Sequence, residues 1–116
     1  MDDRTMLELA AKAVGIVNEG FDEHSGYDVW WLPDANSYDA WNPLENDGDA
    51  LRLAVKLGLD VELHGCLTVF PYACAYDCER NIAEEEQPDD GDVFKATRRA
   101  ITRAAAEIQL AKESGK

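Results

Sequence analysis

The side chains best suited to nucleophilic or metal chemistry gather in one stretch, where His64 is followed by Cys66, Cys74 and Cys78. A histidine can activate a nearby cysteine or serine, but that pair needs a third group to orient the histidine, and no recognisable pattern supplies one. A structural zinc site uses four ligands and usually begins with a C-x2-C or C-x4-C pair, which Cys74-Ala-Tyr-Asp-Cys78 does not match. We therefore expect small buried or half-buried thiols, no metal and no cofactor.

Motifs of the common enzyme classes are missing from the sequence. It has no glycine-rich phosphate loop, no G-x-S-x-G, no H-E-x-x-H and no two-cysteine redox motif. A general acid needs a buried carboxyl group with a raised pKa, whereas most of the carboxylates here lie in polar segments. The odd number of cysteines, without a secretory signal, argues against a disulfide framework. We expect a protein that is not an enzyme, and a small enzyme using His64 and a cysteine stays as an alternative.

The segment Glu45-Asn46-Asp47-Gly48-Asp49 has oxygen ligands at close spacing beside a glycine, as at the start of a calcium-binding loop. The bidentate glutamate that ends such a loop is missing, because its position falls on a lysine or a leucine. Carboxylates also suit the positive end of a helix dipole. We interpret Asp47 and Asp49 as the start of a helix, with one of them as its N-cap.

Carboxylates and aromatic side chains are concentrated between Glu19 and Asp49. This span has nine carboxylates and no lysine or arginine, and five aromatic residues follow Phe21 within it. Trp30 and Trp31 are neighbours in a predicted strand, so they point to opposite faces and at least one lies away from the core. Aromatic side chains within a carboxylate-rich surface are typical of a binding site for a basic protein.

A second acidic stretch lies between residues 77 and 92, where eight side chains are acidic and only Arg80 is basic. The predicted partner-binding residues from the two stretches are Asp28, Trp30, Trp31, Asp34, Tyr38, Asp39, Trp41, Glu45, Asp47, Asp49, Glu84, Glu85, Glu86, Asp89 and Asp90. The alternative interpretation is that the charge only solvates loops and that the tryptophans pack beneath them.

The overall charge excludes several kinds of partner. With 24 acidic and 11 basic side chains among 116 residues, the formal net charge is −13, which opposes direct binding to nucleic acid or to an anionic membrane. The line of Lys95, Arg99 and Arg103, with Arg98 beside it, is typical of a solvated helix face paired with nearby acids. No apolar run is long enough to cross a bilayer, and the start Met1-Asp2-Asp3 is unlike a signal peptide, so we expect a cytoplasmic protein.

The spacing of apolar residues predicts a single compact α+β domain with a small, mainly antiparallel sheet packed against helices. The order α-β-α-β-β-α is expected. The first helix is capped at Thr5–Glu8 and ends near Gly15, and a polar connection over 16–26 leads to a strand over 27–32. An acidic loop over about 33–49 comes next, followed by a helix that is buried on more than one side and ends at Gly58. A strand over 59–63 then turns at His64-Gly65 into a strand over 66–70, and a mobile acidic loop over about 77–92 precedes a helix from Asp92 to about Lys112.

Two parts of the sequence resemble a known group of proteins. Trp41-Asn42-Pro43-Leu44 with residues 47–57, and the closing residues 96–108, resemble small proteobacterial phage and prophage proteins of unassigned function, and the layout is similar to the phage α-β-α sandwich domain. The shared motifs are structural: an aromatic loop anchor, a buried helix and an amphipathic C-terminal helix. The resemblance implies a genetic context, and it brings no catalytic residues.

The sequence therefore leads to a hypothesis of binding and not of catalysis. We expect a non-enzymatic phage or prophage accessory protein that binds a basic, nucleic-acid-binding surface of a host protein. Its carboxylates would stand where phosphates stand in DNA, as in inhibitors of CRISPR effector complexes, which is an argument by analogy. The alternative is a structural or regulatory phage module that self-associates.

Overall fold

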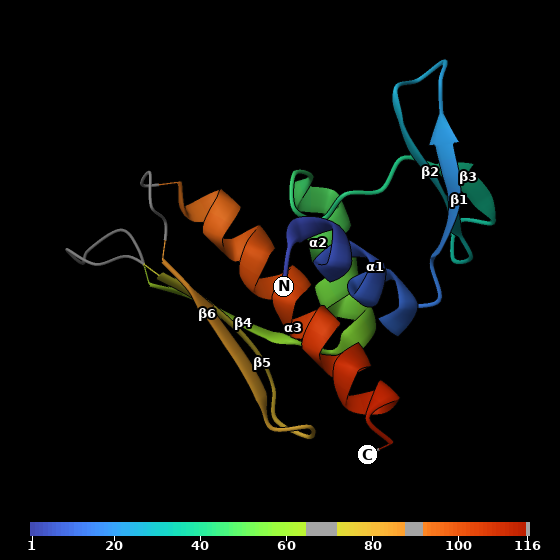
Figure 1. The fold of residues 1–116 in the computed structure, drawn as a ribbon. Helices are drawn as coiled ribbons and strands as arrows, with labels where there is room; N and C mark the ends of the chain where they lie inside the picture. The colour runs from blue at the N-terminus through green and yellow to red at the C-terminus, as the bar shows by residue number, and fades with distance from the viewer. Residues whose placement is uncertain (65–71, 88–91, 116) are drawn as a thin grey trace.

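Three helices and two small antiparallel sheets make up the part of the chain that the computed structural model describes, which is residues 1–64, 72–87 and 92–115 (Figure 1). The elements in chain order are α1 (Asp3–Ala13), β1 (Val17–Asp22), β2 (Tyr27–Leu32), β3 (Ser37–Asp39), α2 (Asp47–Leu57), β4 (Asp60–His64), β5 (Tyr72–Asp77), β6 (Ile82–Glu86) and α3 (Val93–Glu113). The predicted α+β class is confirmed.

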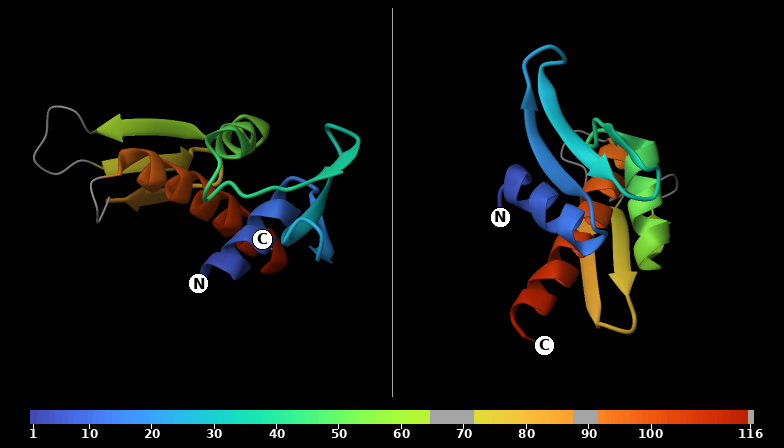
Figure 2. Two further views of the ribbon diagram at one scale, coloured as in Figure 1. Left: turned by 90° about the horizontal axis from the view of Figure 1, so that it is seen from above. Right: turned by 90° about the vertical axis from the view of Figure 1, so that its right-hand side faces the viewer.

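The helices lie between the two sheets. Strands β1, β2 and β3 form one three-stranded sheet, called sheet A, and β4, β5 and β6 form the other, called sheet B; the strands of each pair in chain order. Helix α3 crosses one face of sheet B and packs against α1 and α2 on its other side, while sheet A stands beyond α1 and α2 (Figures 1 and 2). The hairpin of β1 and β2 therefore extends away from the helices.

Small side chains let α3 lie close to β5. Ala100 and Ala104 on the helix, and Ala73 and Ala75 on the strand, are completely buried in one cluster. An alanine adds no flexible atoms to either surface, so the helix and the strand approach without gaps. This contact fixes sheet B on the helices.

A hydrogen-bonded loop fixes the start of α2 and the position of Trp41. The carboxylate of Asp49 accepts a hydrogen bond from the backbone N–H of Asn42 at 3.0 Å and another from Arg52 at 2.7 Å. Asn46 caps the helix, because its side chain accepts from the N–H of Asp49 at 2.9 Å. The residue beside Asn42 is Trp41, whose ring meets that of Trp30 edge-on with centroids 5.2 Å apart.

The order of elements differs from the prediction. The connection expected over 16–26 contains β1, the acidic loop expected over 33–49 contains β3 and the first turn of α2, and the loop expected over 77–92 contains the end of β5 and all of β6. These strands have few buried apolar residues, so their sequences lack the alternation that marks a strand. Cross-strand pairing with a neighbour forms them, and the local sequence does not signal it.

The partner of β4 also differs from the prediction. Residues 66–70, expected to pair with 59–63, lie outside the described part of the chain. The strand that pairs with β4 is β5, with Asp60 opposite Tyr76 and His64 opposite Tyr72.

The helix ends are close to those predicted, but other residues cap the two N-termini. Helix α1 is capped by Asp2, whose carboxylate accepts from the N–H of Thr5, so Thr5 lies within the helix. Asn46, and neither predicted aspartate, caps α2. Gly58 ends α2 as expected, in a left-handed conformation with φ of 67°, and α3 starts where expected, with Asp92 as its N-cap.

Burial of α2 and α3 differs at a few positions. The helix ending at Gly58 was expected to be buried on more than one side, but its residues Leu51 and Val55 are 64% and 73% exposed, whereas Asp49 is buried. Helix α2 is therefore buried on one side only. In the amphipathic helix α3, Ile101 and Ile108 are buried, while Phe94 is exposed because it lies in the first turn.

We predict that Asp49→Ala lowers the free energy of unfolding by about 1–3 kcal/mol, because the N–H of Asn42 and the guanidinium of Arg52 lose their acceptor. Urea denaturation measures this difference. Glu45→Ala is the matched control, since Glu45 is exposed in the same loop, and it should change stability by less than about 0.5 kcal/mol. Equal effects of the two variants would contradict this role of Asp49.

The turn between β5 and β6 predicts a dependence of stability on pH. The Arg80 side chain, which bonds to the buried carboxylate of Asp77, holds the pKa of that carboxyl below its usual value, and the N–H groups of Glu79 and Arg80 add to this effect. A carboxyl group whose pKa is lowered by folding contributes stability above its unfolded pKa of about 4, and that stability is lost as the pH falls through the folded pKa.

We therefore expect Asp77→Asn to cost about 1 kcal/mol at pH 7 and progressively less below about pH 4. Urea denaturation of both proteins between about pH 3 and 7 measures the difference. Glu79→Gln in the same turn is the control and should show no such trend. A cost of Asp77→Asn that stays constant over this range would exclude the ion pair as its source.

Candidate partner-binding site

The outer face of sheet A, which points away from the helices, carries an exposed row of apolar side chains. In the strand register Val17 of β1 lies opposite Trp31 of β2, and Trp31 lies opposite Tyr38 of β3. The rings of Trp31 and Tyr38 are 4.8 Å apart between centroids. Tyr38 is 63% exposed, Val17 51% and Tyr27, on the same face, 50%, so the described residues leave this surface largely open.

The surroundings of this row are acidic. No lysine or arginine occurs between Lys12 and Arg52, and the exposed carboxylates of Glu19 and Glu23 lie on the β1–β2 hairpin. The turn itself is ordered by Asp22, whose side chain accepts from the N–H of His24 at 3.1 Å. Asp28 of β2 pairs with Arg4, and the sheet as a whole combines aromatic side chains with a net negative charge.

The two tryptophans of β2 have different roles, as their adjacent positions predict. Of the residues in β1, β2 and β3, only Trp30 is buried, and it packs on Trp41, which is buried too. Trp31 points to the opposite face and is half-buried. Among the tryptophans proposed as anchors, Trp31 is the one that a partner can reach.

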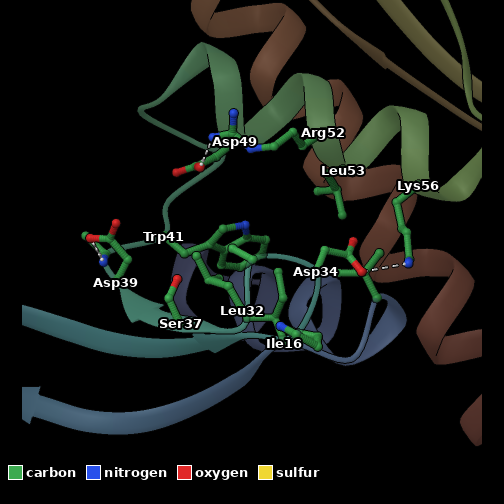
Figure 3. Close-up of a pocket in the computed structure, with 14 residues that line it drawn as sticks. Ile16, Leu32, Asp34, Ser37, Asp39, Trp41, Asp49, Arg52, Leu53 and Lys56 are labelled. Atoms are coloured by element: carbon green, nitrogen blue, oxygen red, sulfur yellow. Dashed lines mark hydrogen bonds and ion pairs between the residues drawn. The ribbon is translucent and has the colours of Figure 1, made fainter.

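A cavity of about 370 Å³, open to solvent on one side, lies between the inner side of sheet A and α2 (Figure 3). Its apolar part is formed by Ile16 before β1, Leu32 at the end of β2, Trp41 in the loop and Leu53 on α2. Three of the predicted acids line it: Asp34, Asp39 and Asp49. Sequence analysis placed these acids on one surface with Tyr38, but β3 separates them, since Tyr38 points outward while Ser37 and Asp39 line the cavity.

Two ion pairs lie along the α2 side of the cavity. Lys56 donates to Asp34 at 3.1 Å, and Arg52 donates to Asp49 at 2.7 Å. The carboxylate of Asp39 accepts the N–H of Ala40 at 2.8 Å and, among the described residues, pairs with no cation. Within the described part of the chain, Asp39 is thus the one carboxylate of the cavity without a cationic partner, and its side chain is exposed.

The remaining predicted acids do not form one surface. Asp28 accepts from Arg4 and Asn18, both at 3.3 Å, and Asp47 pairs with Arg98 at 2.7 Å. Glu45 is exposed in the loop before α2. Asp89 and Asp90 lie outside the described residues.

Alternation along β6 separates the three consecutive glutamates. Glu84 and Glu86 lie opposite Ala75 and Ala73 on the side of α3, where Glu86 pairs with Arg103 at 2.7 Å. Burial raises the pKa of Glu84, and the nearby charge of Glu107 raises it further. Glu85 lies on the other face of sheet B.

That outer face of sheet B contains acids and tyrosines as well. Tyr76 donates its hydroxyl proton to Glu62 at 2.9 Å, which is the main reason that its pKa is raised to about 12. Asp60 and Glu85 lie on the same face, the first opposite Tyr76 and the second opposite Cys74. This surface is acidic, but the Tyr76 hydroxyl on it is already engaged in a hydrogen bond with Glu62.

The cysteines and histidines give little support to the chemistry considered first. Cys74 is half-buried, as expected, and burial with the nearby Glu85 raises the pKa of its thiol, which opposes formation of a reactive thiolate. Cys78 is exposed, in contrast to the prediction, because it follows the end of β5. Cys66 and the side chain of His64 are not described. Within the described residues no group of three histidine, cysteine or acidic side chains is placed to hold a metal ion.

The basic side chains of α3 pair with acids, as predicted, but most of their partners are distant in sequence. Arg98 bonds to Asp47 and to the carbonyl of Leu44, and Arg99 pairs with Asp3 at 3.0 Å. Arg103 pairs with Glu86 in the second acidic stretch. These cations therefore join the elements around α3.

No helix in the described part of the chain is both long enough and apolar enough to cross a membrane.

Sequence reasoning missed Val17 on the outer face, and it missed Ile16, Leu32 and Leu53 in the cavity. The sequence signal that could have found Val17 is the pair of segments on either side of Asp22–Gly26, which suggests a β-hairpin. In the structure Gly26 adopts a positive φ of 81°, which suits the turn of that hairpin. The cavity had no sequence signal, because its residues come from four separate segments.

Comparison with family models, with curated proteins and with solved structures found no match to this chain.

We predict that Trp31 accounts for most of the tryptophan fluorescence that a collisional quencher reaches. Trp31→Phe should remove most of the acrylamide quenching and cost less than about 1.5 kcal/mol of stability. Trp30→Phe is the control and should leave the quenching in place, because Trp30 and Trp41 are buried. An equal loss of quenching in the Trp30→Phe and Trp31→Phe proteins would contradict the outward orientation of Trp31.

Proposed function

We propose that this protein acts by binding, without catalysis, to a basic surface of another protein through the outer face of sheet A. The observation that carries the proposal is the exposed row of Val17, Trp31 and Tyr38 in a stretch without any cationic side chain. Tryptophan and tyrosine are the residue types that contribute most to protein interfaces. The surrounding carboxylates would attract and orient a basic partner.

The arrangement of cations supports the same assignment. The arginines of α3 are engaged with Asp47, Asp3 and Glu86 on the helical side of the molecule. The carboxylates on the β1–β2 hairpin have no such neighbours in sequence, since Lys12 and Arg52 are the nearest basic residues on either side. A partner that supplied positive charge there would compensate this end of the molecule.

The finer form of the proposal concerns the partner. On the resemblance to phage and prophage proteins, the partner is a host protein that handles nucleic acid, and the acidic surface occupies its nucleic-acid site as a DNA mimic. A formal net charge of −13 suits this role. Competition tests it: duplex DNA should displace the captured partner, and this protein should itself show no binding to that DNA.

We expect a partner captured from a nuclease-treated host lysate to be lost when the row is truncated. Trp31→Ala with Tyr38→Ala should weaken capture by about thirtyfold, because anchoring aromatic residues contribute about 2 kcal/mol or more at an interface. Raising the salt from about 0.05 to 0.5 M should weaken capture by about tenfold or more, since it screens exposed charges. Quantitative mass spectrometry of the eluates measures both effects.

Charge reversal provides a matched control for this experiment. Glu19→Lys with Glu23→Lys changes the charge near the row, while Glu79→Lys in the β5–β6 turn with Glu113→Lys at the end of α3 makes the same change in net charge outside sheet A. The first pair should reduce capture and the second should not. If both pairs reduce it equally, or if no partner depends on Trp31 and Tyr38, the proposed docking surface is wrong.

A further inference from the structure

The cavity between sheet A and α2 has the size and lining of a site for a small ligand. Its volume of about 370 Å³ lies in the range of about 300–1,000 Å³ typical of ligand pockets. Ile16, Leu32, Trp41 and Leu53 supply an apolar floor from four separate segments, and charged groups stand at its margins. Apolar walls with a few polar groups are the usual composition of a binding pocket.

Hydrogen bonds and ion pairs hold the polar margin of the cavity in place. Asp49 is buried and bonds both to Asn42 and to Arg52, so the Arg52 guanidinium is engaged at one side. Lys56 is engaged with Asp34 at the other. Figure 3 shows Asp34 and Asp39 at opposite ends of the cavity, with Trp41 and Leu32 between them and α2 above.

The balance of charge selects the kind of ligand. Three carboxylates and two cations line the cavity, and both cations already bond to a carboxylate. An anionic ligand would have to displace an ion pair and would also meet the net charge of −13. A cationic ligand meets Asp39, which is exposed and lacks a counter-charge among the described residues, and the Trp41 indole lines the same cavity.

We propose that this cavity binds a small organic cation, with an aromatic or branched aliphatic body on Leu32, Trp41 and Leu53 and an amidinium, guanidinium or ammonium group at Asp39. The site lies on the opposite side of β3 from the docking surface proposed above, and its binding of a free ligand does not depend on that function. The cation could be a free small molecule, or it could be an arginine or lysine side chain of a bound partner protein, which has the same chemistry. Only the side chain of a partner rests on the proposed function.

Benzamidine is a suitable probe, because it joins a flat apolar ring to an amidinium group. Titration of the ¹⁵N-labelled full chain should give saturable shifts of the Trp41 indole and of the backbone around Ala40 and Leu53, with a Kd on the order of 1 mM for a ligand of this size. Benzamide lacks the charge and benzoate reverses it. Each should bind at least about threefold more weakly than benzamidine.

Two variants and one control locate the binding. Asp39→Asn should weaken benzamidine binding by about three- to tenfold, while leaving the weak binding of benzamide unchanged. Ser37→Phe should abolish binding of both, since it places a ring in the cavity from β3. Glu45→Gln, which removes an exposed carboxylate that does not line this cavity, should have no effect. Equal binding of benzoate and benzamidine, an unchanged Kd in Asp39→Asn, or the absence of saturable shifts would overturn the proposal.

A competition experiment distinguishes the two possible sources of the cation, a partner side chain and a free molecule. An excess of benzamidine during capture of the partner should release that partner if one of its side chains fills the cavity, and should leave it bound if the natural ligand is a free molecule. Trp31→Ala with Tyr38→Ala should bind benzamidine like the wild type. Loss of partner capture in that variant with intact benzamidine binding therefore tests the two proposals separately.

Discussion

The edge-on contact between Trp30 and Trp41 joins sheet A to the helices, and the arrangement of both proposed sites depends on it. Trp30 is the buried side chain of sheet A, and Trp41 belongs to the loop that leads into α2. Asp49 holds that loop by accepting a hydrogen bond from the N–H of Asn42. This hydrogen bond at the start of α2 therefore fixes the loop residue Trp41 for its contact with Trp30. Burial of two indoles offers a large apolar area for a sheet that contributes little else to the core.

This attachment has two consequences for the surface. Because Trp30 faces inward, its neighbour Trp31 must face outward, where it lies in the row with Val17 and Tyr38. Trp41 lies between sheet A and α2, and the cavity beside it is lined by Leu32 of the sheet and Leu53 of the helix (Figure 3). The docking surface and the cavity are therefore the two sides of one small sheet.

The uneven distribution of charge has a structural reason. Arginines on α3 pair with Asp3, Asp47 and Glu86, which come from three different parts of the chain, so the few cations are used where elements meet. The β1–β2 hairpin extends away from these elements and has no cation of its own (Figure 1). Its exposed carboxylates Glu19 and Glu23 remain in water, at little cost to the folded state, and keep their field available to a basic partner.

The sequence by itself determined the helices, β2 and the opposite orientations of Trp30 and Trp31, because capping residues, apolar periodicity and strand alternation act over a few neighbouring positions. It also determined that Arg98, Arg99 and Arg103 form a cationic side of α3. Only the tertiary structure decided that β1, β3 and β6 are strands, since their residues gain order from cross-strand partners and not from their own pattern.

Tertiary structure also decided which predicted residues share a surface. Asp39 and Asp49 are ten positions apart on different elements, and they line one cavity, while the adjacent Tyr38 faces the other side of the sheet. The sequence shows that acidic and aromatic residues are concentrated in one segment. Its division into a docking row and a cavity follows from the strand register and from the packing of Trp41, neither of which can be read from residue types alone.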